Sequence, residues 1–144
     1  MFTIDLSKVI MVSYDEKQLD QLIKNLRDRD GWVRSRAATR LGELKAKEAV
    51  DELAKILKDD RDSLVRSSAA AALGDLGPEA EKAVETLIET LKTDQIVGVR
   101  LEAAVALGSI GDEDAVTELT KIALEDEDIR VRSWAADAIR KIKG

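Results

Sequence analysis

The 144-residue chain contains no cysteine and no histidine, and each absence excludes a kind of chemistry. Without cysteine there can be no disulfide, thiolate metal site or cysteine nucleophile. Without histidine the chain lacks the commonest metal ligand and the usual general base. We therefore expect no bound metal, no cofactor and no enzymatic activity. A site built from carboxylates alone stays formally open, although no carboxylates cluster beyond the pattern of solvated helices.

Long apolar runs are also missing, and the charge balance is acidic. No run approaches the roughly 18 residues of a membrane span, and the first residues lack the basic start of a secretory signal. We therefore expect a cytoplasmic protein without membrane contact. The net charge of −6 argues against nucleic acid as a partner. A charged fraction of 36% with a single asparagine, Asn25, suits a thermostable or an engineered scaffold without distinguishing a natural from a designed chain.

What the sequence does contain is a repeat with a period of 32 to 34 residues. Each copy has a Val-Arg pair, then an Ala-Ala pair that begins four residues after the valine. The four valines are Val33, Val65, Val99 and Val131. Apolar residues recur four, eight and eleven residues after each valine, which places them on one face of a helix.

Each Val-Arg segment is preceded by a second segment with helical periodicity, so the sequence predicts an all-α fold of four helix pairs, an α-solenoid. The expected helices are 14–27 with 31–44, 47–58 with 63–76, 79–92 with 96–110, and 113–125 with 128–142. Residues 13–144 form one array, divided as 13–44, 45–76, 77–110 and 111–144. Ser13-x-x-Glu16 fits a capping box at its start. Residues 1–12 lie outside the repeat, as an N-terminal extension or a cap over the first pair.

The pattern Val-Arg-x-x-Ala-Ala-x-x-Leu-Gly-x-Leu resembles the HEAT repeat. It is similar in particular to the short variant of phycobilisome-lyase-type HEAT-like proteins and to artificial helical-repeat scaffolds built from archaeal members of that group. The resemblance implies that the turn aspartates and helix arginines form a structural ladder between neighbouring repeats. These residues are Asp28, Arg34, Asp60, Arg66, Asp94, Arg100, Asp126 and Arg132. HEAT-repeat deoxyhypusine hydroxylases hold iron with His-Glu motifs, which this histidine-free chain cannot supply.

The resemblance also implies that the Val-Arg helices line the concave side. Its solvent-facing positions would then lie one and two residues before the valine, and two, three, six and ten after it. Large apolar residues and both tryptophans occupy many of them, which is typical of an interaction surface. We expect this face to bind a protein partner. The candidate binding residues are Trp32, Arg36, Leu64, Val97, Leu101, Glu102, Val105, Ile129, Arg130 and Trp134.

Charges on this face are mixed, with Arg36, Arg130 and Lys141 against Glu43, Asp75, Glu102 and Asp137. A groove for nucleic acid needs a basic stripe, which is missing here. Other interpretations stay open. Trp32 and Trp134 could close the ends of the core, and Leu64 and Ile129 could be staples at helix starts. The chain could be an engineered or structural scaffold without a cellular partner, or a lyase-like or chaperone subunit acting on a chromophore protein. It could be a monomer, or a weak homodimer through the apolar patch.

Small residues inside the Val-Arg helices point to close helix packing. Gly42, Gly74 and Gly108 occupy one column of the repeat, where glycine destabilises a helix by about 1 kcal/mol relative to alanine. We expect close contact between neighbouring helices to compensate. The fourth copy has Arg140 in this column, which fits a last helix acting as a polar C-terminal cap.

Overall fold

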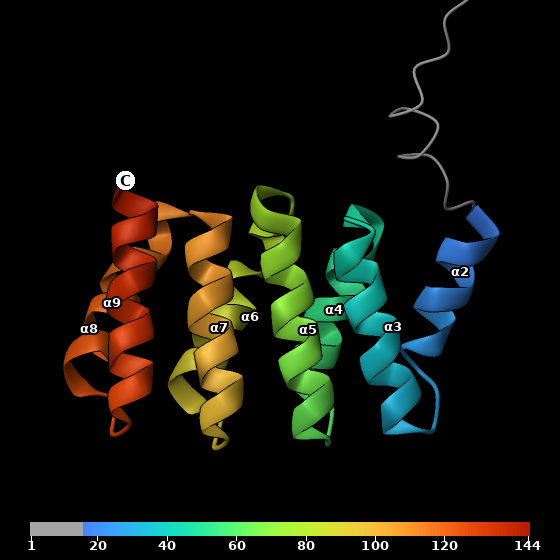
Figure 1. Ribbon diagram of the computed structural model, residues 1–144, viewed down its shortest axis with the longest axis horizontal. Helices are drawn as coiled ribbons and strands as arrows, with labels where there is room; N and C mark the ends of the chain where they lie inside the picture. Colours follow the sequence, from blue (N-terminus) through green and yellow to red (C-terminus); the bar gives the residue numbers. More distant parts are fainter. Residues whose placement is uncertain (1–15) are drawn as a thin grey trace, which may run out of the picture.

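The computed structural model describes residues 16–144, which form a row of stacked helices (Figure 1). With the labels of Figure 1, the helices are α2 (Glu16–Asn25), α3 (Gly31–Glu43), α4 (Val50–Asp59), α5 (Ser63–Leu76), α6 (Val84–Thr93), α7 (Val97–Ile110), α8 (Val116–Glu125) and α9 (Ile129–Lys143). Residues 16–144 include no β-strand. The predicted all-α solenoid of helix pairs is confirmed. The capping box at Ser13 and the extension 1–12 lie outside the described residues.

The helices form two layers. Helices α3, α5, α7 and α9, the Val-Arg helices, pack side by side as an inner layer (Figure 1). Helices α2, α4, α6 and α8 form the outer layer, and each packs against the inner helix that follows it in the chain. Neighbouring inner helices contact one another far more extensively than neighbouring outer helices do. The inner layer is therefore the shorter, concave side of the array.

The outer helices begin later than the sequence predicted. Short 3-10 segments, Lys47–Ala49, Gly77–Ala83 and Glu113–Ala115, lead into α4, α6 and α8. Each ends in a buried alanine packed at the junction, so the chain turns tightly there before it becomes α-helical. Helix α2 ends at Asn25, two residues before its predicted end, because the backbone N–H of Arg27 bonds to Lys24, three residues back. An apolar stripe does not distinguish a 3-10 turn from an α-helical one.

Aspartates start the inner helices. The side chains of Asp30, Asp62 and Asp128 accept the backbone N–H two residues ahead, at 2.9, 2.9 and 2.8 Å. These N-cap bonds satisfy amides that the helix itself leaves free. At α7 the N-cap is Ile96, which has no such side chain, so α7 lacks this side-chain bond. Asp94 accepts the N–H of Ile96 at 3.0 Å, as the equivalent aspartate does in each of the other repeats.

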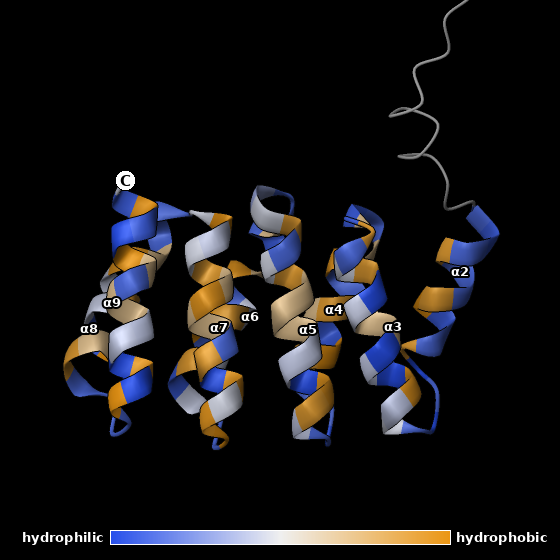
Figure 2. Cartoon of the chain, in the orientation of Figure 1, coloured by the Kyte–Doolittle hydropathy of each residue, from blue (hydrophilic) through white to orange (hydrophobic). Residues whose placement is uncertain are grey.

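The core lies between the two layers and is built from leucine, valine and alanine. The leucines eight residues after the valines (Leu41, Leu73 and Leu107) are fully or almost fully buried, as are Val65, Val99 and Val131. Among the inner helices α7 is mostly apolar, whereas α3 and α9 carry more hydrophilic residues (Figure 2). This difference follows from position, because α7 has an inner-layer neighbour on both sides.

Neighbouring inner helices approach so closely that the glycine column has no room for a side chain. A Cβ added at Gly42 would lie 2.8 Å from the Cα of Ala72. The corresponding distance is 3.1 Å from Gly74 to Ala106 and from Gly108 to Ala138. Backbone atoms oppose these positions and cannot move aside as a flexible side chain would. Close packing is therefore the reason for glycine at this column.

This packing predicts opposite effects of alanine at two glycines. Gly42→Ala should lower the free energy of unfolding by about 1–3 kcal/mol, because the added methyl group collides with the backbone of α5. Gly98→Ala is the matched control, since nothing lies within 4 Å of its Cβ position. It should leave stability unchanged or raise it by up to about 1 kcal/mol. Denaturant unfolding followed by circular dichroism measures both, and equal effects would contradict the packing argument.

Candidate functional site

On inner helices α3, α5 and α7 an arginine joins its own repeat to the next one. Arg34 donates from Nε to Asp60 Oδ2 at 2.8 Å and from Nη2 to Asp60 Oδ1 at 3.1 Å. Its Nη1 donates to the backbone carbonyl of Asp28 at 2.8 Å. One planar guanidinium therefore fixes the turn of its own repeat and the carboxylate of the following turn.

The same arrangement recurs along the array. Arg66 pairs with Asp94 at 2.8 and 3.2 Å and donates to the carbonyl of Asp60 at 2.9 Å. Arg100 pairs with Asp126 at 3.2 and 3.3 Å and donates to the carbonyl of Asp94 at 2.8 Å. Each of the three aspartates also accepts the backbone N–H two residues ahead. We call these pairs the ladder.

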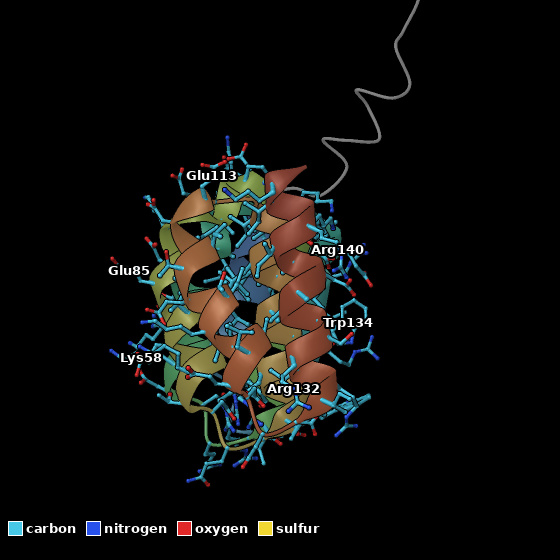
Figure 3. The ribbon with its side chains drawn as sticks, turned by 90° about the vertical axis from the view of Figure 1, so that its left-hand side faces the viewer. Lys58, Glu85, Glu113, Arg132, Trp134 and Arg140 are labelled. Atoms are coloured by element: carbon cyan, nitrogen blue, oxygen red, sulfur yellow. The ribbon has the colours of Figure 1, made fainter. Side chains whose placement is uncertain are left out.

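The ladder has an unfinished position at each end. Arg132 donates from Nη1 to the carbonyl of Asp126 at 2.6 Å, and no described carboxylate pairs with its other edge. At the first repeat, the Asp28 carboxylate accepts only the N–H of Asp30, at 2.8 Å, among the described residues. Arg132 lies near the base of α9 (Figure 3).

Burial and charge pairing together set the ionisation of the ladder. Burial disfavours the charged form of Asp60, but hydrogen bonds from Arg34 and from the backbone of Asp62 outweigh it and lower the pKa of Asp60. The hydrogen bond with Asp60 raises the pKa of Arg34, and that with Asp94 raises the pKa of Arg66. These groups are charged, paired and largely shielded from solvent, so they hold repeats together and are not free to engage a ligand.

The exposed surface of the inner layer, which we call the inner face, carries most of the predicted binding residues. The side chains of Leu64, Val105 and Ile129 are exposed on α5, α7 and α9. Trp32 is 61% exposed and Trp134 is 47% exposed, so neither tryptophan is a core residue. Trp134 projects from the side of α9 opposite to Lys58 and Glu85 of the outer helices (Figure 3).

Some predicted positions are less exposed than the repeat pattern suggests. Ser35 was expected to face solvent, but it is buried between α3 and α5, and its hydroxyl oxygen lies 2.7 Å from that of Ser68. Val97 and Leu101 are half-buried and pack against the core. For Ser35 and Leu101 the reason is that the next inner helix covers the position two residues after the valine; in α9, which has no following helix among residues 16–144, the same position, Ser133, is exposed.

The predicted basic residues of the face already have local contacts. The guanidinium carbon of Arg36 lies 6.0 Å from the centre of the Trp32 ring, within range of a cation–π interaction. These two residues line a shallow recess of about 330 Å³ together with Ser35, Thr39, Arg40 and Glu43. Arg130 pairs with Asp128 at 2.9 Å, and this hydrogen bond lowers the pKa of Asp128 to about 2.

Glu102 is the predicted face residue with a perturbed carboxyl group. It is half-buried on α7. Burial raises its pKa, and the negative charge of Asp75 on α5 raises it further. The sequence showed both residues as charges of this face, but only the structure shows that they interact.

Sequence reasoning missed two exposed apolar side chains among the described residues, Ile96, the N-cap residue of α7, and Leu124, which lies on outer helix α8 and is 74% exposed. Leu124 is the one that departs from the outer-helix pattern. The corresponding positions of the two preceding repeats are Lys58 and Lys92, so the departure was visible in the repeat. Among residues 16–144 no three histidine, cysteine, aspartate or glutamate side chains are grouped as metal ligands. No helix in that range is long and apolar enough to span a bilayer.

A family model described as HEAT repeats matches residues 19–97 and 79–140. The chain belongs to the HEAT-repeat family. The predicted resemblance is therefore confirmed, and the Val-Arg helices with their ladder are the second helices of HEAT units. No curated protein matches the sequence.

Solved structures share the fold. A chain from the complex of CpcE and CpcF of phycocyanin lyase from Nostoc sp. PCC7120 superposes with a TM-score of 0.78 at 23% identity, covering 92% of this chain and 86% of that one. Human deoxyhypusine hydroxylase in complex with glycerol gives a TM-score of 0.74 at 28% identity, covering 96% of this chain. The HEAT array spans only 46% of the hydroxylase chain.

The unfinished end of the ladder supplies a matched test of its strength. Arg66→Ala removes a carboxylate pair and leaves Asp94 without its partner, so we expect unfolding free energy to fall by about 3 kcal/mol. Arg132→Ala removes only a bond to a carbonyl, and the expected loss is about 1 kcal/mol. Chemical denaturation of both variants checks this. Equal losses would show that the carboxylate pairs contribute little to stability.

The ladder also predicts loss of stability in acid. Because the pKa of Asp60 is lower in the folded chain than its ordinary value of 3.8, its ionised form stabilises the fold at neutral pH. That contribution is lost as the pH falls below about 4 and through the folded pKa. Asp60→Asn should therefore lose less stability than the wild type between neutral pH and about pH 3. Denaturant titrations at a series of pH values measure this, and an unchanged profile would remove Asp60 as a cause.

Proposed function

We propose that this HEAT-repeat chain is a non-catalytic scaffold that binds a protein partner on its inner face. The observation that carries the proposal is the exposure of two tryptophans with Leu64, Val105 and Ile129 on one layer. Large apolar side chains grouped on a surface mark interaction sites, and tryptophan is enriched among residues that dominate binding energy. The ladder joins the turns before successive inner helices and holds these helices in a fixed arrangement, which reduces the entropy lost on binding.

The charges of the face favour protein over nucleic acid. Acidic groups, Asp75 and Glu102, lie in the middle of the inner layer, where a phosphate backbone would need basic residues. The carboxylates of the ladder are also not available as catalytic groups, because each is paired with an arginine.

A second candidate is a subunit of a lyase-like assembly that acts on a chromophore protein. The similarity over most of a chain in the CpcE and CpcF complex supports it, although only at the level of the fold. Mixing the chain with a bilin and a chromophore-binding protein and recording absorbance would distinguish this role. A scaffold that merely binds protein should leave the bilin spectrum unchanged.

The proposed function is tested by comparing two exposed apolar positions on opposite layers. Affinity capture from a cell extract would use the wild type, Val105→Asp on α7 and Leu124→Asp on α8. Both variants introduce the same charge at an exposed helical site. We expect a polypeptide that is retained by the wild type and by Leu124→Asp but lost with Val105→Asp, because only Val105 lies on the inner face.

Trp134→Ala should weaken the same interaction at least about tenfold, as expected for an exposed aromatic residue that anchors a partner. Circular dichroism of each variant establishes that helix content is retained. Recovery of the same polypeptides with all variants would assign binding elsewhere and contradict the proposal.

A further inference from the structure

Several charged residues of the inner face are neutralised by neighbours on their own helix or its preceding turn. Glu43 of the inner face pairs with Arg40 at 3.2 Å, and Arg130 of the inner face pairs with Asp128 at 2.9 Å. Asp137 of the inner face pairs with Arg140. These groups leave little net charge for a partner to recognise.

Four charged residues of the inner face have no ion pair within residues 16–144, one on each inner helix. They are Arg36, Asp75, Glu102 and Lys141. Arg36 lies over Trp32, and the Lys141 ammonium donates to the Ser109 hydroxyl at 3.4 Å. The nearby Lys45 ammonium bonds the backbone carbonyl of Asp75, at 2.6 Å, and not its carboxylate. From α3 to α9 the order of charge is therefore positive, negative, negative, positive.

Apolar side chains lie on the same face as the two central carboxylates. Glu102 is half-buried, and the exposed Val105 lies one turn further along α7. Leu64 on α5 and Trp134 on α9 add apolar surface from the helices on either side. An incoming cation would relieve the unfavourable interaction between Glu102 and Asp75, and the apolar residues would exclude water around it.

The outer two charges limit which partners fit. Arg36 and Lys141 would repel basic residues at the ends of a segment lying across the four helices, and would attract acidic ones. A uniformly basic segment therefore gains at the centre and loses at both ends. Repulsion of this kind is a common source of specificity between similar partners.

We propose that the inner face recognises an extended protein segment with basic residues at its centre, acidic residues at its ends and apolar residues between them. The inference rests on the proposed function and specifies its partner. Packed helices lie about 8–10 Å apart, and an extended chain advances about 3.3 Å per residue. One inner helix is therefore crossed about every three residues, and about ten residues cross all four.

Two synthetic peptides of identical composition test the order of charge. The matching peptide is Glu-Leu-Ser-Lys-Leu-Ser-Lys-Leu-Ser-Glu, and the inverted peptide is Lys-Leu-Ser-Glu-Leu-Ser-Glu-Leu-Ser-Lys, both with blocked ends. Because both tryptophans of the chain lie on the inner face and the peptides contain none, tryptophan fluorescence reports binding at this surface. We expect the matching peptide to bind about tenfold more tightly, with a difference that shrinks as salt is added.

Variants with equal changes in net charge locate the effect. The double variant Asp75→Asn with Glu102→Gln should abolish the preference between peptides. The control, Glu85→Gln with Glu89→Gln, changes two exposed carboxylates of outer helix α6 and should retain it. Glu85 points away from the inner face (Figure 3).

Any of three results of the peptide experiment would overturn the inference: equal affinities for the two peptides, no binding of either up to about 1 mM, or a preference that survives in the Asp75 and Glu102 double variant. Self-association abolished by Val105→Asp would assign the face to a second copy and would also overturn it. A natural partner that depends on Val105 and Trp134 but not on the two carboxylates would leave the proposed function standing while refuting this charge pattern.

Discussion

The bidentate pair between an inner-helix arginine and the aspartate of the next turn determines how successive repeats are placed. A hydrophobic interface alone lets two helix pairs slide or rotate, because apolar burial has little directional preference. The guanidinium of Arg34 removes that freedom, since it bonds one carbonyl in its own repeat and two carboxylate oxygens in the next. Three such pairs in series hold the inner helices at one spacing.

That spacing explains both the small residues of the inner layer and its usefulness as a surface. Helices held this close need Gly42 opposite Ala72 and the equivalent pairs further along. The outer helices have no such constraint and stand further apart. The inner layer thus presents a nearly continuous surface to which every helix contributes exposed side chains. Residues between the constrained columns can vary without disturbing the stack, and the tryptophans lie there with the charges that have no ion pair among the described residues.

Repeated columns made the helix pairs predictable, because four copies of one unit report the same packing environment, and the resemblance to HEAT repeats implied the ladder. The exposure of single positions was less predictable. Ser35 and Leu101 occupy the same position in their repeats and were both expected to face solvent, yet each is covered in part by the next helix. Their burial depends on the distance between helices, which no single repeat encodes. The coupling of Glu102 with Asp75 depends on the same distance, so it too became visible only in the structure.

The two ends of the array differ from its interior in a way that bears on partners. Asp28 and Arg132, which have no ion pair within residues 16–144, are complementary, and by themselves would favour stacking one copy on another. The packing columns oppose it. Arg40, in the first repeat, occupies a position that is alanine in the second, third and fourth repeats. Arg140, in the fourth repeat, occupies a position that is glycine in the first three. Two copies stacked in the manner of internal repeats would place these bulky, like-charged side chains where Gly42 meets Ala72 within one chain. Steric conflict with the backbone outweighs one additional ion pair, so the structure favours contact through the inner face over contact through the ends.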